Sequence, residues 1–267
     1  MIKNLVIGSD GFIGKPLCEF LEKEKGEKVI RFDLKRGGKE DARFAKLPLS
    51  EVDRVYFLAW DVGGAKYLYD LKSQPFQLDW NMKLLSNVMP QLAESGKPFL
   101  FVSSQLAEEY DTVYGVTKRL GEVWTRLIPA GVFIRQWNVY GPIEPKSERS
   151  HVIADFIYQA IKTGEIRMMT TGQERRQFIH IHDTCEAWYE ALNTNLKRIH
   201  DVTSFEWIQI IEVAETIGKL TGAKVIPGEK AGSTPLTPIK GKIPGWFPKI
   251  SMEEGLKKMI EDAKKLF

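Results

Sequence analysis

The sequence predicts an α/β fold in which a doubly wound parallel sheet carries a smaller, interleaved C-terminal cap. Three observations support this prediction. Apolar, strand-like runs alternate with amphipathic stretches through the first half of the chain, and the first run leads directly into a glycine-rich turn. After Gly141-Pro142 the alternation stops, and proline-rich and helical segments follow. Alternating strands and helices are typical of parallel sheets covered on both faces.

The first half contains five apolar runs that are short enough for strands. They are Lys3–Ile7, Lys28–Phe32, Arg54–Ala59, Phe99–Ser103 and Val132–Trp137. Three amphipathic stretches between them are predicted as helices, namely Gly11–Lys25, Pro75–Glu94 and Val113–Leu127. Because crossovers between parallel strands are right-handed, these elements are expected to form one sheet with helices on both sides.

The second half is predicted to be more helical. The expected helices are His151–Thr163, Thr184–Asn193, Phe205–Thr221 and Met252–Leu266, with a short strand at Ile166–Thr170. The stretch 227–250 contains five prolines and is expected to be mostly loop. We assign residues 1–142 and 176–216 to the sheet domain, and residues 143–175 and 217–267 to the substrate-binding cap.

The composition excludes several classes of protein. The 267 residues are 43% hydrophobic and 27% charged, with a formal net charge of +3 and mixed signs along the chain, so no nucleic-acid partner is expected. No apolar stretch reaches about 18 residues, so no membrane span is expected. The N-terminus is predicted as a strand, not a signal peptide. Cys18 and Cys185 are too few for a disulfide framework or a zinc site, which indicates no metal and a cytoplasmic location.

The turn Gly8–Gly14 has the sequence GSDGFIG, and it lies between the first strand and the first helix. Glycines in this position allow a tight turn and a close backbone approach to a pyrophosphate, which the N-terminus of the helix then binds. The turn therefore predicts a dinucleotide site of the Rossmann type. The predicted cofactor contacts from it are Gly8, Gly11, Phe12, Ile13 and Gly14.

The next strand ends at Asp33, 19 residues after Gly14. An acid at this place binds the ribose hydroxyls of NAD and repels the 2′-phosphate of NADP, so NAD is the expected cofactor. Arg31, Lys35 and Arg36 leave room for NADP. Five further residues are predicted near the cofactor from the order of their segments: Asp41, Ala42, Leu58, Ala59 and Asn81.

Tyr114 and Lys118 are four residues apart in a predicted helix, so the phenol and the ammonium lie on one face. A phenol titrates near pH ~10, and a nearby positive charge lowers that value enough for proton transfer. The pair alone is more often plain helix surface. Following the glycine turn and Asp33, it predicts a catalytic site.

These segments together resemble the extended short-chain dehydrogenase/reductase family, in particular its NAD-dependent nucleotide-sugar epimerases, dehydratases and reductases. The resemblance covers nearly the whole chain. The motifs that carry it are GSDGFIG (8–14), Asp33, DAR (41–43), FLAW (57–60), FVSS (101–104), YGVTK (114–118), RQWNVYGP (135–142) and GQERRQFIHIHD (172–183).

The resemblance implies roles for the catalytic residues. Tyr114 is the expected acid/base, and Lys118 holds the nicotinamide ribose and lowers the Tyr114 pKa. Ser103 and Ser104 both fit as the serine that binds the reacting sugar oxygen, with Ser104 favoured. His151 follows NVYGP at the spacing of the epimerisation histidine in GDP-fucose synthases, and the alternative is a histidine bonded to the helix start.

The resemblance also implies substrate contacts. Arg176 matches the arginine that pairs with the nucleotide phosphates, for which bidentate contacts are well suited. Gly63 and Gly64 resemble a glycine pair of GDP-fucose synthases and GDP-mannose 3,5-epimerases. Trp60 replaces the usual small residue, so it either narrows the sugar pocket or simply packs. Gln105 and Asn138 complete the expected set.

The chain also departs from the family. Gln105-Leu106 stands where the double epimerases carry a cysteine and the 4,6-dehydratases an Asp-Glu pair, which argues against both activities. Only nine residues separate Ser104 from Tyr114. The resulting prediction is a carbohydrate-biosynthesis enzyme, an NAD-dependent epimerase that acts through a transient 4-keto nucleotide sugar. The alternatives are a reductase of a 4-keto nucleotide sugar and a non-catalytic dinucleotide-binding subunit. Apolar residues on the helices at 76–94 and 113–128 predict a homodimer, and a well-buried helix pair is the alternative.

Overall fold

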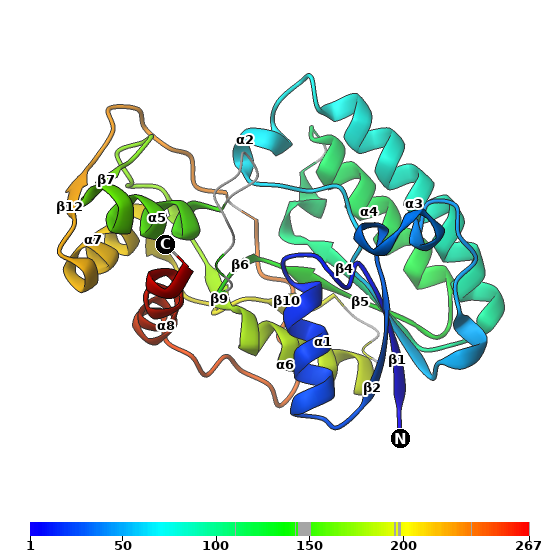
Figure 1. The fold of residues 1–267 in the computed structure, drawn as a ribbon. Helices are drawn as coiled ribbons and strands as arrows, with labels where there is room; N and C mark the ends of the chain where they lie inside the picture. The colour runs from blue at the N-terminus through cyan, green and yellow to red at the C-terminus, as the bar shows by residue number, and fades with distance from the viewer. Residues whose placement is uncertain are drawn as a thin grey trace. The chain divides into compact units, whose positions relative to one another are not determined.

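The computed structural model describes the whole chain except residues 110, 142, 144–150, 195, 197–198, 236 and 267. The chain forms two compact units (Figure 1). Unit 1 comprises Met1–Gln136, Cys185–Val202 and Ile239–Trp246, and unit 2 comprises Trp137–Thr184, Thr203–Pro238 and Phe247–Phe267. No described helix is both long enough and apolar enough to cross a membrane.

Unit 1 is built on a six-stranded parallel sheet with the strand order β10-β5-β4-β3-β1-β2. The strands are β1 (Lys3–Ile7), β2 (Lys28–Phe32), β3 (Arg54–Phe57), β4 (Phe99–Ser104), β5 (Gly131–Gln136) and β10 (Asp201–Val202). All residues of β3 and β4 are buried, because helices cover both faces of the sheet. This burial explains why these strands appear in the sequence as continuous apolar runs.

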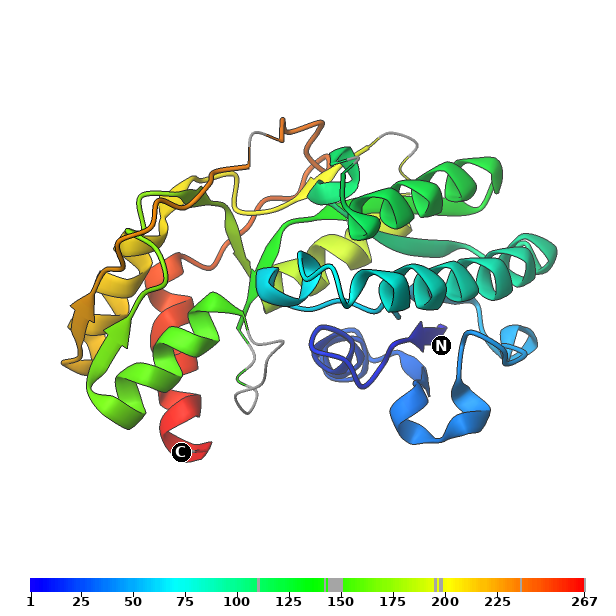
Figure 2. The same ribbon diagram turned by 90° about the horizontal axis from the view of Figure 1, so that it is seen from above.

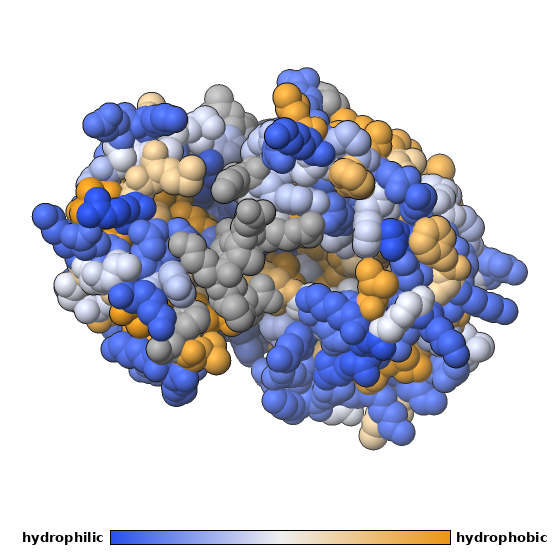
Figure 3. All heavy atoms as spheres, turned by 45° about the horizontal axis from the view of Figure 1, so that its top comes forward, coloured by the Kyte–Doolittle hydropathy of each residue, from blue (hydrophilic) through white to orange (hydrophobic). Residues whose placement is uncertain are grey.

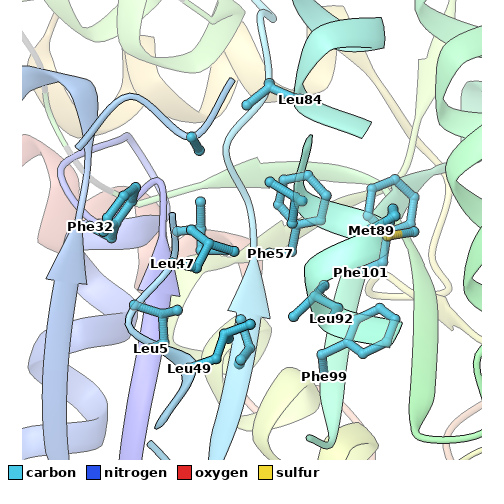
Figure 4. Packing of buried hydrophobic residues seen from close by; sticks show 14 of the residues in the cluster. Leu5, Phe32, Leu47, Leu49, Phe57, Leu84, Met89, Leu92, Phe99 and Phe101 are labelled. Carbon is cyan, nitrogen blue, oxygen red and sulfur yellow. The ribbon is translucent and has the colours of Figure 1, made fainter. Parts of the chain in front are cut away.

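Helices α1 (Gly14–Lys23) and α6 (Ile181–Asn193) lie on one face, where Phe20 and Tyr189 pack edge to face. Helices α3 (Gln74–Ser95) and α4 (Val113–Leu127) lie side by side on the other face (Figure 2). Side chains from β1, β3, β4 and α3 interlock in the main apolar core beneath them (Figure 4). That core includes Leu5, Phe57, Met89, Phe99 and Phe101.

The strand order reverses at β1, which pairs with β2 on one side and with β3 on the other. The chain leaves β1 through the glycine turn and α1 toward β2, and later reaches β3 on the opposite side. Such a switch point opens a crevice at the carboxyl ends of the strands, where open α/β sheets bind ligands. The topology therefore places Gly8, Asp33 and Leu58 at one edge of the sheet.

Unit 2 has its own core. The helices α5 (Val152–Thr163), α7 (Ile210–Thr221) and α8 (Met252–Leu266) contribute most of its buried apolar side chains. Short strand pairs complete it: β6 (Asn138–Tyr140) with β9 (Phe178–His180), β7 (Glu165–Arg167) with β12 (Lys224–Ile226), and β8 (Arg175–Arg176) with β11 (Ile208–Gln209). The described part of unit 1 also contains the short helix α2 (Ala65–Leu68) and the 3₁₀ helices η1 (Leu34–Arg36), η2 (Gly38–Glu40), η3 (Leu49–Glu51) and η4 (Gln105–Glu108).

The observed division of the chain differs from the domain boundaries expected from the sequence. Residues 137–141, 176–184 and 203–216 group with unit 2, and residues 239–246 group with unit 1. The last segment joins unit 1 because the Asp201 carboxylate accepts hydrogen bonds from the backbone N–H groups of Lys240 and Gly241, at 2.6 and 3.3 Å. A long-range polar contact of this kind leaves no local signal in the sequence.

Candidate active site

The glycine turn is closed by contacts that only glycine permits. Gly8 has φ +93°, and a Cβ atom there would lie 2.7 Å from the backbone nitrogen of Ala59. A Cβ on Gly14 would lie 1.9 Å from the carbonyl oxygen of Gly8. A Cβ on Gly11 would meet only the carbonyl oxygen of Gly8, at 3.2 Å. The turn thus presents bare backbone at the start of α1, whose N-cap Ile13 makes no capping side-chain bond, and this arrangement fits a pyrophosphate.

Leu58 and Ala59 lie beside this turn, as the sequence predicts. Their backbone N–H groups both donate to the carbonyl of Ile7, at 2.9 and 2.8 Å. Asp33 lies at the turn as well, and one carboxylate oxygen accepts from the backbone N–H of Asp10 at 2.9 Å. The other oxygen accepts from the N–H of Lys35 at 2.9 Å. The end of β2 and the glycine turn are therefore joined through one carboxylate.

Asp41 and Ala42, which the sequence predicts near the cofactor, make contacts within the protein itself. Ala42 is buried in the main core, and its carbonyl accepts a hydrogen bond from Asn87 at 2.9 Å. The Asp41 carboxylate is paired with the Arg43 guanidinium at 2.6 Å, and hydrogen bonds from Arg43 lower the pKa of Asp41. The Arg43 guanidinium stacks 3.4 Å from the centre of the Trp80 ring. These contacts hold the loop after β2 against the main core and Trp80.

Asn81 holds the loop after β3. Its side-chain oxygen accepts from the backbone N–H of Asp61 at 2.8 Å, and its side-chain nitrogen donates to the Asp61 carbonyl at 3.2 Å. The Asp61 carboxylate accepts from the hydroxyl of Tyr67 at 2.6 Å. The loop between them contains Gly63, which is buried, and Gly64. Both polar atoms of the Asn81 amide are thus engaged with the loop, and the cofactor contact that the sequence assigns to Asn81 stays a prediction.

Tyr114, Lys118 and Ser104 converge at the carboxyl end of β4, where the start of α4 passes over it. Thr112 caps α4 by accepting from the N–H of Gly115 at 3.0 Å, which fixes the helix start next to Tyr114. The Ser104 hydroxyl lies beside the Tyr114 phenol and acts to lower its pKa. The Ser104 hydroxyl also accepts from the N–H of Leu106 at 3.2 Å, so its orientation is fixed.

The electrostatics of the pair differ from the sequence-based prediction. Burial raises the pKa of the Tyr114 phenol to about 12, and Ser104 opposes this rise. The prediction that Lys118 lowers the Tyr114 pKa is therefore wrong for this structure. The Lys118 ammonium donates to the carbonyl of Val102 at 2.6 Å and lies 5.8 Å from the centre of the Tyr114 ring. Burial lowers the pKa of Lys118 itself, and the charge of Glu122 opposes that shift.

Trp60 packs against the main core and faces Lys118. Its ring makes aromatic contacts with Phe57 and Phe101, and the Lys118 ammonium lies 4.0 Å from the ring centre. A cation that is buried against an aromatic face is stabilised by the ring quadrupole. The structure thus supports packing, the second of the two roles expected for Trp60, and adds a contact with the lysine.

Ser103 points away from Tyr114. Its hydroxyl donates to Glu122 at 2.7 Å, and the Glu122 carboxylate is fully buried. Arg135 donates to both oxygens of Glu122, at 2.7 and 2.9 Å, and also pairs with Glu108. This buried ion pair, which the sequence analysis missed, braces β4 and β5 behind the candidate site.

The two serines can be separated by experiment. Ser104→Ala is expected to reduce kcat by about 10- to 1,000-fold, because the hydroxyl lies beside the phenol and a donor to a reacting oxygen is worth this much. Ser103→Ala is expected to leave kcat within about threefold and to reduce the free energy of unfolding by about 1–3 kcal/mol, because it removes a donor to a buried carboxylate. Steady-state kinetics and urea unfolding measure the two effects. If Ser103→Ala instead lost activity and Ser104→Ala lost only stability, Ser103 would be the functional serine.

Gln105 follows Ser104 and is buried, and its side-chain oxygen has no hydrogen-bond partner among the described residues. A buried acceptor without a donor is costly, so the position suits a ligand that donates a hydrogen bond. Glu108 closes the short loop onto Arg135 and Lys240, the latter at 3.8 Å.

The remaining predicted residues lie in unit 2. The Asn138 side chain donates to the carbonyl of Gln177 at 2.9 Å, and Arg176 donates to the carbonyl of Ser233 at 2.8 Å. His151 immediately precedes α5 and its side chain does not cap the helix, and its catalytic role stays a prediction. Desolvation lowers the pKa of His151 from its ordinary value of 6.5. Pro142, the last residue of the motif RQWNVYGP, and Ser150, which precedes His151, fall outside the described residues.

Comparison with known proteins adds three likenesses. The chain is 24% identical to UDP-glucuronic acid decarboxylase 3 of Arabidopsis thaliana over 97% of its own length and 88% of the relative. It is 25% identical to a dTDP-4-dehydro-6-deoxy-D-allose reductase of Streptomyces bikiniensis, over 86% of this chain and 85% of that protein. The fold matches UDP-glucuronic acid 4-epimerase of Bacillus cereus, solved with UDP-glucuronic acid and NAD, with a TM-score of 0.76 and 21% identity, over the full length of both chains.

The family model for the NAD dependent epimerase/dehydratase family matches residues 4–202, which is most of the chain. That range spans the glycine turn, Asp33, and the Ser104, Tyr114 and Lys118 cluster. The chain belongs to the NAD dependent epimerase/dehydratase family and is an enzyme of the extended short-chain dehydrogenase/reductase type.

Proposed function

We propose that this protein is an NAD-dependent nucleotide-sugar epimerase that acts through a transient 4-keto sugar. The observation that carries the proposal is the cluster at the carboxyl end of β4, where the half-buried Tyr114 lies with Ser104 and with the buried Lys118, whose ammonium is 5.8 Å from the centre of the Tyr114 ring. A fixed proton donor and acceptor of this kind suits reversible oxidation of a secondary hydroxyl. The B. cereus epimerase of the same fold was solved with UDP-glucuronic acid and NAD, which supports a nucleotide sugar as substrate.

Different residues of the chain would bind different parts of NAD. The bare backbone of Gly8, Gly11 and Gly14 would receive the pyrophosphate, and the Asp33 carboxylate would receive the adenosine ribose. Lys118 would hold the nicotinamide ribose by exchanging its bond to the Val102 carbonyl. Bound NAD supplies a hydride acceptor.

Tyr114 handles the proton at the sugar oxygen. In the forward direction its oxygen accepts the proton of the sugar hydroxyl, and in the return direction it gives that proton to the ketone. Ser104 keeps the same oxygen in place. Because burial raises the Tyr114 pKa to about 12, the phenolate is scarce at neutral pH, so the rate of the oxidation step is expected to rise as the pH increases toward that value.

The other predicted residues are each assigned a substrate contact in this proposal. Gln105, whose buried oxygen lacks a donor among the described residues, would accept a hydrogen bond from a sugar hydroxyl. Gly63 and Gly64 would let the sugar approach the loop after β3. Arg176 would pair with the diphosphate and Asn138 with the sugar. His151, with its lowered pKa, would be neutral at pH 7 and able to accept a proton.

The relatives favour two other outcomes of the same 4-keto chemistry. The Arabidopsis relative is a decarboxylase of UDP-glucuronic acid, and the Streptomyces relative is a reductase. A panel of UDP-, GDP-, dTDP- and CDP-sugars that includes UDP-glucuronic acid separates them by NMR of the products. An epimer with no net change in NADH supports the proposal. Release of CO₂ would assign a decarboxylase, and stoichiometric NADH consumption a reductase. Cofactor binding without turnover on any sugar would favour a non-catalytic subunit.

We also propose that the protein forms a homodimer in the cytoplasm through α3 and α4. These helices expose Phe76, Leu78, Val116, Leu120, Val123 and Leu127, and Figure 3 shows apolar side chains along the upper right edge, where α3 runs. Four other apolar residues of α3 are buried in the main core and are not part of this surface: Leu84, Leu85, Val88 and Leu92. The two cysteines, buried free thiols, support a reducing compartment.

Sedimentation equilibrium is expected to show a dimer that Leu120→Asp converts to a monomer with an unchanged melting temperature. An aspartate at this half-exposed position would be desolvated only in the interface. Leu266→Asp, on the exposed end of α8, is the matched control and should stay dimeric. A wild-type monomer would contradict the proposal.

A further inference from the structure

A cluster of charges surrounds the end of β2 and the glycine turn. Its members are Asp10, Asp33, Lys35, Arg36 and Glu40. The Lys35 ammonium donates to the backbone carbonyl of Asp10 at 2.9 Å. The Arg36 guanidinium lies between two carboxylates, at 3.4 Å from Asp10 and 3.6 Å from Glu40. The Glu40 carboxylate also accepts from the backbone N–H of Asp33 at 3.2 Å.

This charge cluster lies next to the turn that is predicted to bind the cofactor. The Asp33 carboxylate bonds the backbone of Asp10 and therefore lies against the turn that presents bare backbone for the pyrophosphate. In a site of this topology the acid at the end of the second strand faces the adenosine ribose, whose 2′ oxygen carries the phosphate that distinguishes NADP from NAD. Lys35 and Arg36, two and three residues further on, are the cations that a 2′-phosphate would meet.

The charge balance of the cluster is unfavourable for that phosphate. Three carboxylates face two cations, so the cluster carries a formal excess of one negative charge. Arg31, at β2, is paired with Glu22 at 2.6 Å, and Lys39, which precedes Glu40, is exposed. The three cations that the sequence offers to NADP, namely Arg31, Lys35 and Arg36, are thus engaged within the protein itself.

We propose that Asp10 and Glu40 are specificity-determining residues that hold Arg36 away from a 2′-phosphate and so reinforce the preference for NAD. Asp33 repels the phosphate directly, and Asp10 and Glu40 act by occupying the guanidinium that would otherwise bind it. An arginine released from its carboxylates is a good bidentate ligand for phosphate. The inference concerns cofactor choice alone and does not depend on which sugar is the substrate.

The test is direct binding of NAD and NADP by isothermal titration calorimetry to the full-length protein, without turnover. Asp10→Asn with Glu40→Gln keeps both side-chain shapes and removes both charges. This double variant is expected to bind NADP about 3- to 30-fold more tightly than the wild type, with NAD affinity within about threefold, because the ion pairs removed are partly exposed. The gain should shrink at 0.5 M salt, where partly exposed charges are screened.

Three further variants identify the cause. Adding Arg36→Ala to the double variant is expected to abolish the gain, whereas Arg36→Ala in the wild type should leave NADP affinity nearly unchanged. Glu19→Gln with Glu51→Gln removes two charges from side chains elsewhere in unit 1, one partly exposed and one exposed, and it should have no effect on the NADP-to-NAD ratio.

The proposal is overturned if the double variant binds NADP no better than the wild type, or if its gain survives Arg36→Ala. Equal weakening of both cofactors together with a lower melting temperature would also overturn it, because the carboxylates would then only brace the turn. Since each readout is a ratio of binding constants, a failure of the epimerase assignment would leave it intact.

Discussion

Tyr114→Phe is expected to reduce kcat by about 10²- to 10⁴-fold, because the variant keeps the ring and loses only the hydroxyl that transfers the proton. The Phe ring fills the same space beside Ser104, so the fold and the binding of NAD should be preserved. Lys118→Met, in contrast, is expected to weaken NAD binding as well as turnover, because its ammonium would hold the nicotinamide ribose. Steady-state kinetics and calorimetric titration with NAD distinguish the two variants.

The matched control is Tyr189→Phe, which also removes one phenolic hydroxyl. That hydroxyl donates to Glu27 at 3.1 Å, and Glu27 precedes β2 at the amino ends of the strands, remote from the glycine turn. Its loss should leave kcat within about twofold. Wild-type turnover by Tyr114→Phe would refute the assigned proton transfer, whatever the sugar.

Arg135→Met is expected to be the most destabilising substitution at the site, with a loss of about 3–5 kcal/mol in the free energy of unfolding. The change leaves the fully buried Glu122 carboxylate without its bidentate partner. Arg119 remains at 3.0 Å and Arg126 at 3.5 Å, but both are partly exposed, so they compensate only in part and the loss should fall toward the lower end. Urea unfolding of the variant measures the loss.

The stability of the protein at acid pH tests the second ion pair of Arg135, which it forms with Glu108. The Arg135 hydrogen bond lowers the pKa of Glu108 below its ordinary value of 4.5. A lowered folded-state pKa stabilises the protein above pH 4.5, and this contribution is lost as the pH falls through the folded-state value. Arg135→Met should therefore flatten the acid limb of stability against pH.

Two controls separate burial from charge. Arg167→Met breaks an exposed pair with Glu165 and should cost less than about 1 kcal/mol. The double variant Arg135→Met with Glu122→Met should recover most of the loss, because it removes both buried charges together. A double variant as unstable as the single one would show that the guanidinium stabilises by packing and not by pairing.

Elements with strong local signals could be predicted closely. β1, β2, α4 and α8 begin and end at the expected residues, because short apolar runs or amphipathic periods mark them. Helix α7 begins at Ile210 and not at Phe205, since Phe205 adopts φ +64°, which a right-handed helix does not accept. β10 has only two residues, too few for a pattern, and the sequence analysis missed it.

The candidate site shows the same limit. The glycine turn and the spacing of Tyr114 and Lys118 are local patterns, so the sequence predicts them. The bond between Ser103 and Glu122 joins residues 19 positions apart, and the pairing of Arg135 with Glu108 spans 27. Contacts of this length depend on the register of the sheet, where Ser103 lies opposite Arg135, and that register is fixed only when the strands have paired.

The threading of the chain back and forth between its two units has a consequence for biosynthesis. The edge strand β10 is made late in synthesis. The backbone N–H groups of Lys240 and Gly241, which bond Asp201 in that strand, are made only when the chain is nearly complete. A nascent chain released from the ribosome at residue 142 would hold every segment of the glycine turn and of the Tyr114 cluster, yet its sheet would end at an open edge along β5. Unpaired edges of this kind are prone to aggregation. Shortened versions ending near this point should accordingly accumulate in inclusion bodies, and expression of the full-length gene is the practical route to active enzyme.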